Sequence, residues 1–306
     1  MTRFLYDHIL IEASPSQPNL RAQPVSRASG LAARAAAALI LTGAALALAG
    51  CTSPARQAEG LARSGGLQTL VLSGDGFQHR AFAGVRPQRG LLFVFVDGDG
   101  TPWTDAGTQV AADPTPRSPL ALKLALETPD SVLYLGRPCY FGLRPQPPCS
   151  AAYWTSRRYS AEVVTSMAAA ATAFAEARGY TRVVLVGYSG GGALVTLMAS
   201  HMHSVAGVVT IAANLDPDAW AQLHGYLPLT GSLNPSLQPP LARTVQEWHL
   251  LGERDARVPY EAAQRYLQRV PPDRVRRYAG FDHVCCWEAA WPPLLREVRA
   301  VLDVSE

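Results

Sequence analysis

The sequence predicts an α/β fold built on a mostly parallel central sheet. From Gly66 onward, apolar strand-like runs alternate with segments of helical periodicity, an order typical of strand–helix–strand units with helices on both faces of the sheet. The 306 residues are 48% hydrophobic and 17% charged, so they can bury one sizeable core. Because no repeat or linker divides this region, we expect a single domain over 66–306.

The expected elements follow one another closely along the chain. Strands are expected at 67–72, 77–84, 89–96, 131–136, 181–187, 205–213, 244–252 and 273–280. Helices are expected at 119–127, 160–179, 191–200, 259–270 and 287–303. Two insertions, 139–160 and 214–242, fall at the carboxyl ends of strands, where substrate contacts are expected, and the second is expected to form a small cap-like insertion.

The first fifty residues have the pattern of an export signal. Arg27 and Arg34 precede an apolar run over 35–49, which is shorter than the roughly 20 residues that cross a bilayer and is typical of a secretion signal. The four residues LAGC at 48–51 resemble the lipobox of bacterial lipoproteins, in which cleavage precedes the cysteine and a lipid is attached to it. An ordinary signal anchor with an incidental Cys51 is the alternative interpretation.

The lipobox resemblance implies a domain organisation and a location. Residues 1–50 are expected to be a leader and signal peptide, Cys51 the lipidated first residue of the mature protein, and 51–65 a linker. The protein is then expected on a bacterial envelope membrane, facing the periplasm. Thr52 stands where an aspartate retains some lipoproteins at the inner membrane, which favours the outer membrane.

Export also permits disulfides among the four remaining cysteines. Of the three possible pairings we favour Cys139 with Cys149, which closes a short proline-rich loop. The adjacent Cys285 and Cys286 either form a vicinal disulfide or stay reduced. A metal site is a competing interpretation, but these cysteines lack the paired CxxC spacing of a zinc site, and we expect no metal.

Ser189 lies in GYSGG at 187–191, between an apolar strand and a helix. A serine hydroxyl becomes a useful nucleophile with a base, a carboxylate that orients the base, and donors for the oxyanion. The motif satisfies GxSxG, the nucleophile elbow, whose glycines permit a sharp turn. Motif and element order together resemble the α/β-hydrolase superfamily over roughly residues 66–303, and the resemblance implies the α/β-hydrolase fold.

The chain order in this family is serine, acid, histidine, so the partners must follow Ser189. Asp255 lies in a loop after the strand expected at 244–252, in a setting similar to that of the family's acid. Glu253 is the alternative acid. Among the seven histidines, His283 alone lies between the last expected strand and helix, where the family places its base. The resemblance therefore assigns Ser189, Asp255 and His283 as the catalytic residues.

Oxyanion donors in this family are backbone N–H groups, one after the serine and one from the loop after the third strand. The first donor is therefore Gly190. The second is expected from VDGDG at 96–100, which resembles an HGxG loop but carries Asp97 where histidine is usual. We choose Asp99, with Gly98 as the neighbouring candidate. Acidic side chains beside a developing negative charge must be turned away or paired. A calcium-binding interpretation of DGDG lacks the remaining EF-hand ligands.

The sequence thus predicts a serine hydrolase that cleaves an ester or related acyl bond of a small molecule, with no metal or organic cofactor. The alternatives are a serine peptidase with the same triad and a catalytically inactive binding lipoprotein. The formal net charge of +3, with scattered basic residues, argues against nucleic-acid binding. The first insertion contains Tyr153, Trp154, Arg157 and Arg158. These side chains could recognise an acidic or aromatic substrate, or the segment could be a solvated helix start capped by Ser156. The oligomeric state is not predicted.

Overall fold

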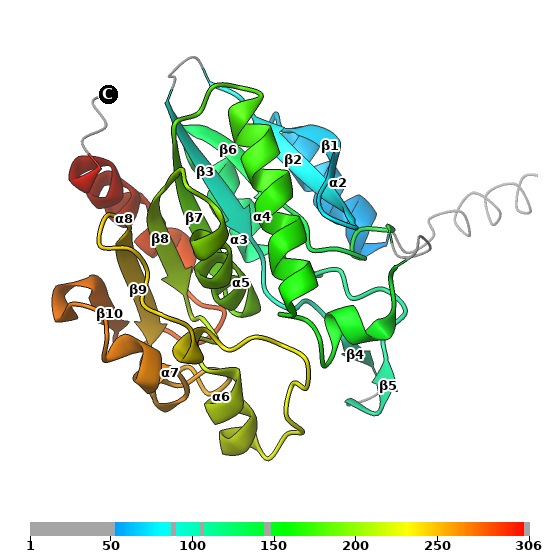
Figure 1. Cartoon of the computed structure of the whole chain (residues 1–306), viewed down its shortest axis with the longest axis vertical. Helices are drawn as coiled ribbons and strands as arrows, with labels where there is room; N and C mark the ends of the chain where they lie inside the picture. The colour runs from blue at the N-terminus through cyan, green and yellow to red at the C-terminus, as the bar shows by residue number, and fades with distance from the viewer. Residues whose placement is uncertain (1–52, 87–89, 105–106, 144–147, 303–306) are drawn as a thin grey trace, which may run out of the picture. The chain divides into compact units, whose positions relative to one another are not determined.

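The computed structural model describes residues 53–86, 90–104, 107–143 and 148–302 (Figure 1). The main sheet consists of β1 (Gln68–Ser73), β2 (Gln78–Gly84), β3 (Leu91–Val96), β6 (Ser131–Leu135), β7 (Arg182–Tyr188), β8 (Val205–Ile211), β9 (Gln246–Gly252) and β10 (Val275–Tyr278). A separate hairpin pairs β4 (Trp103–Thr104) with β5 (Gln109–Val110). The α-helices are α2 (Pro54–Ser64), α3 (Leu120–Leu126), α4 (Ala161–Glu176), α5 (Gly190–Met198), α6 (Pro217–His224), α7 (Tyr260–Leu267) and α8 (Trp287–Val301). Short 3₁₀ helices are η2 (Ala151–Trp154), η3 (Ala199–His201), η4 (Pro235–Leu237) and η5 (Pro272–Arg274).

The sheet is parallel except at one edge. Its strand order is β1-β2-β6-β3-β7-β8-β9-β10. The pairs β1–β2 and β2–β6 are antiparallel, and every neighbouring pair from β6 to β10 is parallel. The predicted α/β fold with a mostly parallel sheet is therefore confirmed. In such a sheet the carboxyl ends of the parallel strands meet at one edge, where ligands usually bind.

The central strand β3 shows how helices cover both faces. All six residues of its run LLFVFV are buried. Phe93 and Phe95 pack in a core with residues of α2, α3 and α8, whereas Val94 and Val96 pack in a second core with residues of α4 and α5. Figure 1 shows α4 and α5 in front of the sheet and α3 and α8 behind it. Since neighbouring side chains of a strand point to opposite faces, such a strand must be apolar at every position.

The expected linker at 51–65 is largely a helix, which corrects that prediction. The Ser53 hydroxyl accepts a hydrogen bond from the Arg56 N–H at 3.3 Å, and Pro54 occupies the first helical position of α2. Both features favour helix initiation. Ala58 and Ala62 are buried against the core. Their small side chains, spaced by four residues, lie on the apolar face of an amphipathic helix and let α2 pack closely.

The leader expected at 1–50 and the lipidation site Cys51 lie outside the described residues. For the part of the chain that the structure does describe, no helix is both long and apolar enough to span a membrane. The assignments of a signal peptide and of a lipid anchor therefore depend on the sequence pattern alone.

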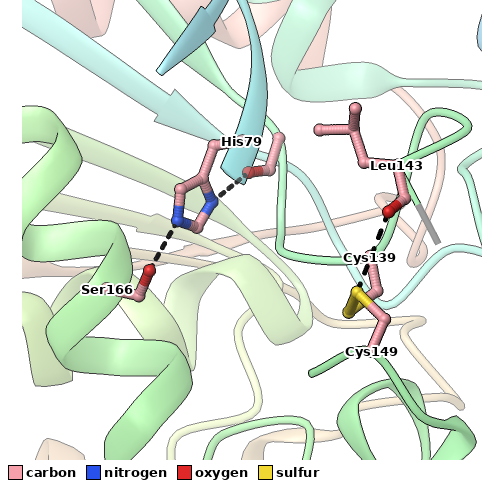
Figure 2. The surroundings of a disulfide bond; sticks show 6 residues. His79, Cys139, Leu143, Cys149 and Ser166 are labelled. Atoms are coloured by element: carbon pink, nitrogen blue, oxygen red, sulfur yellow. Dashed lines mark hydrogen bonds between the residues drawn. A yellow bond between two sulfur atoms is a disulfide. The ribbon is translucent and has the colours of Figure 1, made fainter. Parts of the chain in front are cut away.

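Two pairs of cysteines are joined in the structure. Cys139 and Cys149 form a disulfide with their Cα atoms 5.5 Å apart, as Figure 2 shows. This bond closes the proline-rich loop that follows β6. Cys285 and Cys286, whose pairing the sequence leaves open, are also bonded to each other.

Replacing both Cys139 and Cys149 with serine is expected to lower the free energy of unfolding by about 2 to 3 kcal/mol. The two cysteines are 10 residues apart, and the cross-link restricts that loop in the unfolded chain. Urea denaturation of the oxidised protein and of the double variant measures the difference. Superimposable denaturation curves would contradict the prediction.

His79 ties β2 to α4 in the interior of the domain. Its Nδ1 lies 3.0 Å from the Gly136 carbonyl oxygen, and its Nε2 lies 2.8 Å from the Ser166 hydroxyl (Figure 2). Because a carbonyl only accepts, Nδ1 carries the proton and the Ser166 hydroxyl donates to Nε2. Neither His79 nor Ser166 is exposed. Burial lowers the pKa of His79 to about 4, against a weaker opposing effect of the bond to Gly136.

His79 is expected to make the folded state less stable as the pH falls from about 6.5 to about 4. In that window an unfolded histidine binds a proton that the buried ring does not. The free energy of unfolding therefore falls by up to about 1.4 kcal/mol per pH unit. Urea denaturation of the wild type and of His79→Gln at pH 7 and pH 5 tests this. Between these two pH values we expect the free energy of unfolding to fall by about 2 kcal/mol more in the wild type than in the variant. Equal losses would show that the ring does not titrate in this way.

Candidate active site

Ser189 lies at the turn between β7 and α5, at the carboxyl edge of the sheet. Its backbone has φ 53° and ψ −122°, a conformation that costs a non-glycine residue free energy. Neighbouring segments hold it there. The Ser189 N–H donates to the Ile211 carbonyl at 2.9 Å, and the Ser189 carbonyl accepts from Gly192 at 2.9 Å and Asn214 at 3.2 Å. The strained turn is therefore held by the end of β8 and the residues after it on one side and by the start of α5 on the other, as expected for a nucleophile elbow.

The glycines after Ser189 are required by close packing. A Cβ atom on Gly191 would lie 2.2 Å from the Val96 carbonyl oxygen at the end of β3. A Cβ atom on Gly192 would lie 2.3 Å from the Cβ of Ala213. Both distances are far shorter than a van der Waals contact. Glycine therefore lets the start of α5 sit directly against the ends of β3 and β8.

The structure brings the three predicted catalytic side chains together. His283 Nε2 lies 3.0 Å from the Ser189 hydroxyl oxygen, and His283 Nδ1 lies 2.8 Å from Asp255 Oδ2. Because a carboxylate only accepts, Nδ1 carries the proton and Nε2 is free to accept from the serine. The Asp255 and His283 side chains are only 1% and 9% exposed. This arrangement is the one that activates a serine hydroxyl.

Asp255 is held in one orientation by its own loop after β9. Its Oδ1 accepts from the N–H groups of Arg257 at 2.8 Å and Val258 at 2.9 Å, which leaves Oδ2 directed at His283. The alternative acid, Glu253, has a side chain that is 43% exposed and pairs with Arg277 at 3.6 Å. Glu253 thus pairs with an arginine, whereas Asp255 contacts the histidine and is the acid that the geometry selects.

The His283 loop is anchored by two aromatic residues that the sequence did not single out. The His283 carbonyl accepts from the Tyr188 hydroxyl at 2.9 Å and from the Trp287 indole N–H at 3.1 Å. The Tyr188 ring also lies 5.2 Å from the imidazole, centroid to centroid. Tyr188 directly precedes the serine in the sequence, and this adjacency is the signal by which Tyr188 could have been identified. These contacts fix the imidazole relative to the elbow.

The second insertion contacts the loop that carries Asp255. It folds into α6 and η4, and the side chains of Trp220 and His224 both lie within hydrogen-bonding distance of the Arg257 carbonyl, at 2.8 Å and 2.9 Å. Asn234 connects the two parts of the insertion, because its amide donates to the carboxylates of Asp216 and Asp218. The cap-like insertion is therefore a folded element beside the acid loop.

The predicted oxyanion loop lies next to the serine. A Cβ atom on Gly98 would be 3.1 Å from the Ser189 Cβ. The Gly98 N–H already donates to the Asp97 carboxylate at 3.1 Å, whereas the Asp99 N–H has no hydrogen-bond partner among the described residues. Gly190 opens α5, where the first N–H groups have no partner within the helix. The geometry therefore favours the N–H groups of Asp99 and Gly190 over that of Gly98.

Asp97, which stands where the related loops have histidine, is buried and points away from the serine. Its carboxylate accepts from Gly98 and, at 3.4 Å, from the Tyr134 hydroxyl. Burial raises the pKa of Asp97 to about 7, against the opposing effect of hydrogen bonds from Gly98 and from the first residues of α3. Asp97 thus fixes the start of the loop rather than facing substrate.

Of the two arginines of the first insertion, Arg157 lies at a solvated helix start, as one of the two interpretations expected, whereas Arg158 does not. Arg157 pairs with Glu162 at the surface. Arg158 has a side chain that is 7% exposed and bonds to Asp99, so it is neither a free substrate contact nor part of a solvated helix start. The helix α4 is preceded by Ser160 at its N-cap position, not by Ser156. In the described ranges, no group of three or more His, Cys, Asp or Glu side chains could hold a metal ion.

No protein-family model and no curated protein matches this sequence. Solved structures do match it. An esterase from Pyrococcus furiosus aligns with 78% of this chain and 92% of its own, at 12% identity and a TM-score of 0.54. A bacterial membrane phospholipase A aligns with 88% of this chain and 98% of its own, at 16% identity and a TM-score of 0.51.

A puromycin hydrolase gives a TM-score of 0.56 at 16% identity over 78% of this chain. The match spans only 40% of the length of the puromycin hydrolase. Together with the strand order and the elbow, these similarities show that the chain has the fold of the α/β-hydrolase superfamily.

Proposed function

We propose that this protein is a serine hydrolase that cleaves an ester or related acyl bond. The observation that carries the proposal is the continuous contact from Ser189 through His283 to Asp255. It lies at the sheet edge where two backbone N–H groups, those of Gly190 and Asp99, remain available to an oxyanion. The surrounding fold is one in which the similar solved proteins include an esterase and a phospholipase A.

In the first half of the reaction, the Ser189 oxygen attacks the carbonyl carbon of the substrate while its proton passes to His283 Nε2. The carbonyl oxygen becomes an oxyanion and accepts hydrogen bonds from Gly190 and Asp99. Asp255 stabilises the imidazolium that forms. When the carbonyl re-forms, the bond to the leaving alcohol breaks and the alcohol takes the proton from Nε2, which leaves an acyl group on Ser189.

In the second half, water attacks the acyl carbon and gives a proton to His283 Nε2. The oxyanion again forms between the two N–H groups. Its collapse breaks the bond to the Ser189 oxygen, which regains the proton, and releases the carboxylic acid. Every protein group that takes part ends in its starting state, so no external cofactor is needed to balance the reaction.

The choice between esters and amides is tested with matched substrates. We expect the purified protein to hydrolyse p-nitrophenyl esters and to leave aminoacyl p-nitroanilides largely uncleaved. Faster cleavage of the anilides would identify a peptidase that uses the same residues. Failure to cleave either class would favour a binding protein without turnover.

We also propose that Cys51 carries a lipid that attaches the protein to a bacterial envelope membrane. The support is the LAGC sequence that ends an apolar run. Cells that express the protein are expected to incorporate radiolabelled palmitate into it, and Cys51→Ser is expected to abolish that incorporation. Equal labelling of the variant would contradict lipidation at Cys51.

A further inference from the structure

A buried cluster of charged and phenolic groups converges on the Asp99 carboxylate. Arg137 Nη1 lies 2.5 Å from Oδ1, and Arg158 Nη1 lies 2.8 Å from Oδ2. The Tyr159 hydroxyl lies 2.8 Å from Oδ2 and 3.0 Å from Oδ1. The Arg137 and Arg158 side chains are only 3% and 7% exposed. Three donors from the segment between β6 and α4 therefore hold one side chain of the oxyanion loop.

The same segment also forms a hydrogen bond with the backbone of Asp99. The Tyr140 hydroxyl donates to the Asp99 carbonyl at 2.9 Å. The donors are connected to one another, because Arg137 Nη2 donates to the Arg158 carbonyl at 2.9 Å and Arg158 Nε donates to the Thr155 carbonyl at 2.6 Å. With its carboxylate and its carbonyl both held, Asp99 has little freedom to rotate its peptide groups.

This cluster lies directly against the predicted site. A Cβ atom on Gly190 would lie 2.0 Å from Asp99 Oδ1 and 2.5 Å from the Tyr159 hydroxyl. The held carboxylate therefore packs on the backbone of the residue after the nucleophile. This packing also explains why residue 190 is glycine, because any side chain there would displace the Asp99 carboxylate.

The charge balance supports a role in the site. Two arginines face one carboxylate, so the cluster keeps one positive charge in the interior. Burial alone would raise the pKa of Asp99, but the charges of Arg158 and Arg137 outweigh it and hold this pKa well below its usual range. A buried ion pair is weak evidence of a stabilising role, because removing charges from water is costly. A fixed positive charge beside the elbow, by contrast, favours an oxyanion there.

We infer that Arg137, Arg158 and Tyr159 are positioning residues, which hold the Asp99 N–H toward the oxyanion through the Asp99 carboxylate. This inference rests on the proposed hydrolase function. It assigns the first insertion to the machinery of the reaction rather than to direct recognition of the substrate.

Asp99→Asn tests the inference, because it keeps the backbone N–H but cannot accept from all three donors. We expect kcat for a p-nitrophenyl ester to fall about 10-fold to 100-fold, less than the loss of a whole oxyanion donor, with KM changed less than about threefold. A trifluoromethyl ketone, which forms an oxyanion adduct on the serine, should bind more weakly by the same factor. Asp130→Asn is the matched control, since Asp130 is a buried carboxylate paired with Arg299 and distant from the site in the fold. It should leave kcat within about twofold of the wild type.

A double-mutant cycle tests whether Arg137 acts through Asp99. Arg137→Gln is expected to lower kcat about 10-fold in the wild type but less than threefold in the Asp99→Asn background. Arg137→Lys should restore part of the loss, because it keeps the charge. If Asp99→Asn does not fold, Tyr159→Phe removes one donor without changing any charge, and we expect it to lower kcat about threefold to 10-fold at unchanged KM.

Two outcomes would overturn the inference alone: kcat of Asp99→Asn or Tyr159→Phe within twofold of an active wild type, or additive effects in the cycle. A wild type that neither hydrolyses esters nor reacts with a fluorophosphonate would instead overturn the proposed function, and this inference with it. The two failures are therefore distinguishable.

Discussion

Alanine in place of Ser189 is expected to reduce kcat for ester hydrolysis by about 10⁴-fold to 10⁶-fold. The hydroxyl oxygen is the atom that forms the acyl intermediate, and its contact with His283 Nε2 at 3.0 Å has no substitute in the variant. The oxyanion donors remain, so a small residual rate above the uncatalysed reaction is expected. Steady-state kinetics with a p-nitrophenyl ester measures the effect.

Ser166→Ala is the matched control for this variant. Ser166 also lies within hydrogen-bonding distance of a histidine Nε2, at 2.8 Å from His79. However, Nδ1 of His79 faces a carbonyl instead of a carboxylate, and both residues are buried. We therefore expect Ser166→Ala to lose some stability but to keep its activity. A Ser189→Ala protein with more than a hundredth of wild-type activity would contradict the role given to Ser189.

Asparagine in place of Asp255 is expected to lower kcat by about 10⁴-fold. The reason lies in the loop around the carboxylate. Its Oδ1 accepts two backbone N–H groups, so the amide oxygen of the asparagine would take that position and the NH₂ group would face His283. An NH₂ group donates to Nδ1, which forces the imidazole proton onto Nε2. That nitrogen could then no longer accept the proton of the serine.

Glu253→Gln provides the control for Asp255→Asn. Glu253 is two residues nearer to β9, partly exposed, and paired with Arg277. Its neutralisation should leave kcat within about twofold of the wild type. A large loss in Glu253→Gln together with a small loss in Asp255→Asn would transfer the role of the acid to Glu253.

The parts of the site that short sequence segments encode could be predicted. The elbow at Ser189 is a local motif between a strand and a helix, and the resemblance to the α/β-hydrolase superfamily assigns Asp255 and His283 by their places after later strands. The strand run LLFVFV likewise shows, without further information, that both faces of β3 are covered. For the elbow and for β3, neighbouring residues carry the whole signal.

The parts that depend on distant contacts could not be predicted. Arg137 and Arg158 are 38 and 59 residues from Asp99, and no periodicity or spacing connects them to the loop. The expectation that acidic side chains of this loop must be paired or turned away is met for Asp99 by these two partners, which only the folded chain supplies. The helix α2, by contrast, was missed although it carries local signals: Ser53 at the N-cap, Pro54 at the first helical position and an apolar face that includes Ala58.

Active-site labelling shows whether Ser189 is the activated nucleophile of this fold. The purified protein is treated with a fluorophosphonate, its intact mass is measured, and the modified peptide is mapped. We expect a single adduct on Ser189 that is absent from Ser189→Ala and retained in Ser166→Ala. An adduct on another residue, or none on the folded wild type, would contradict it.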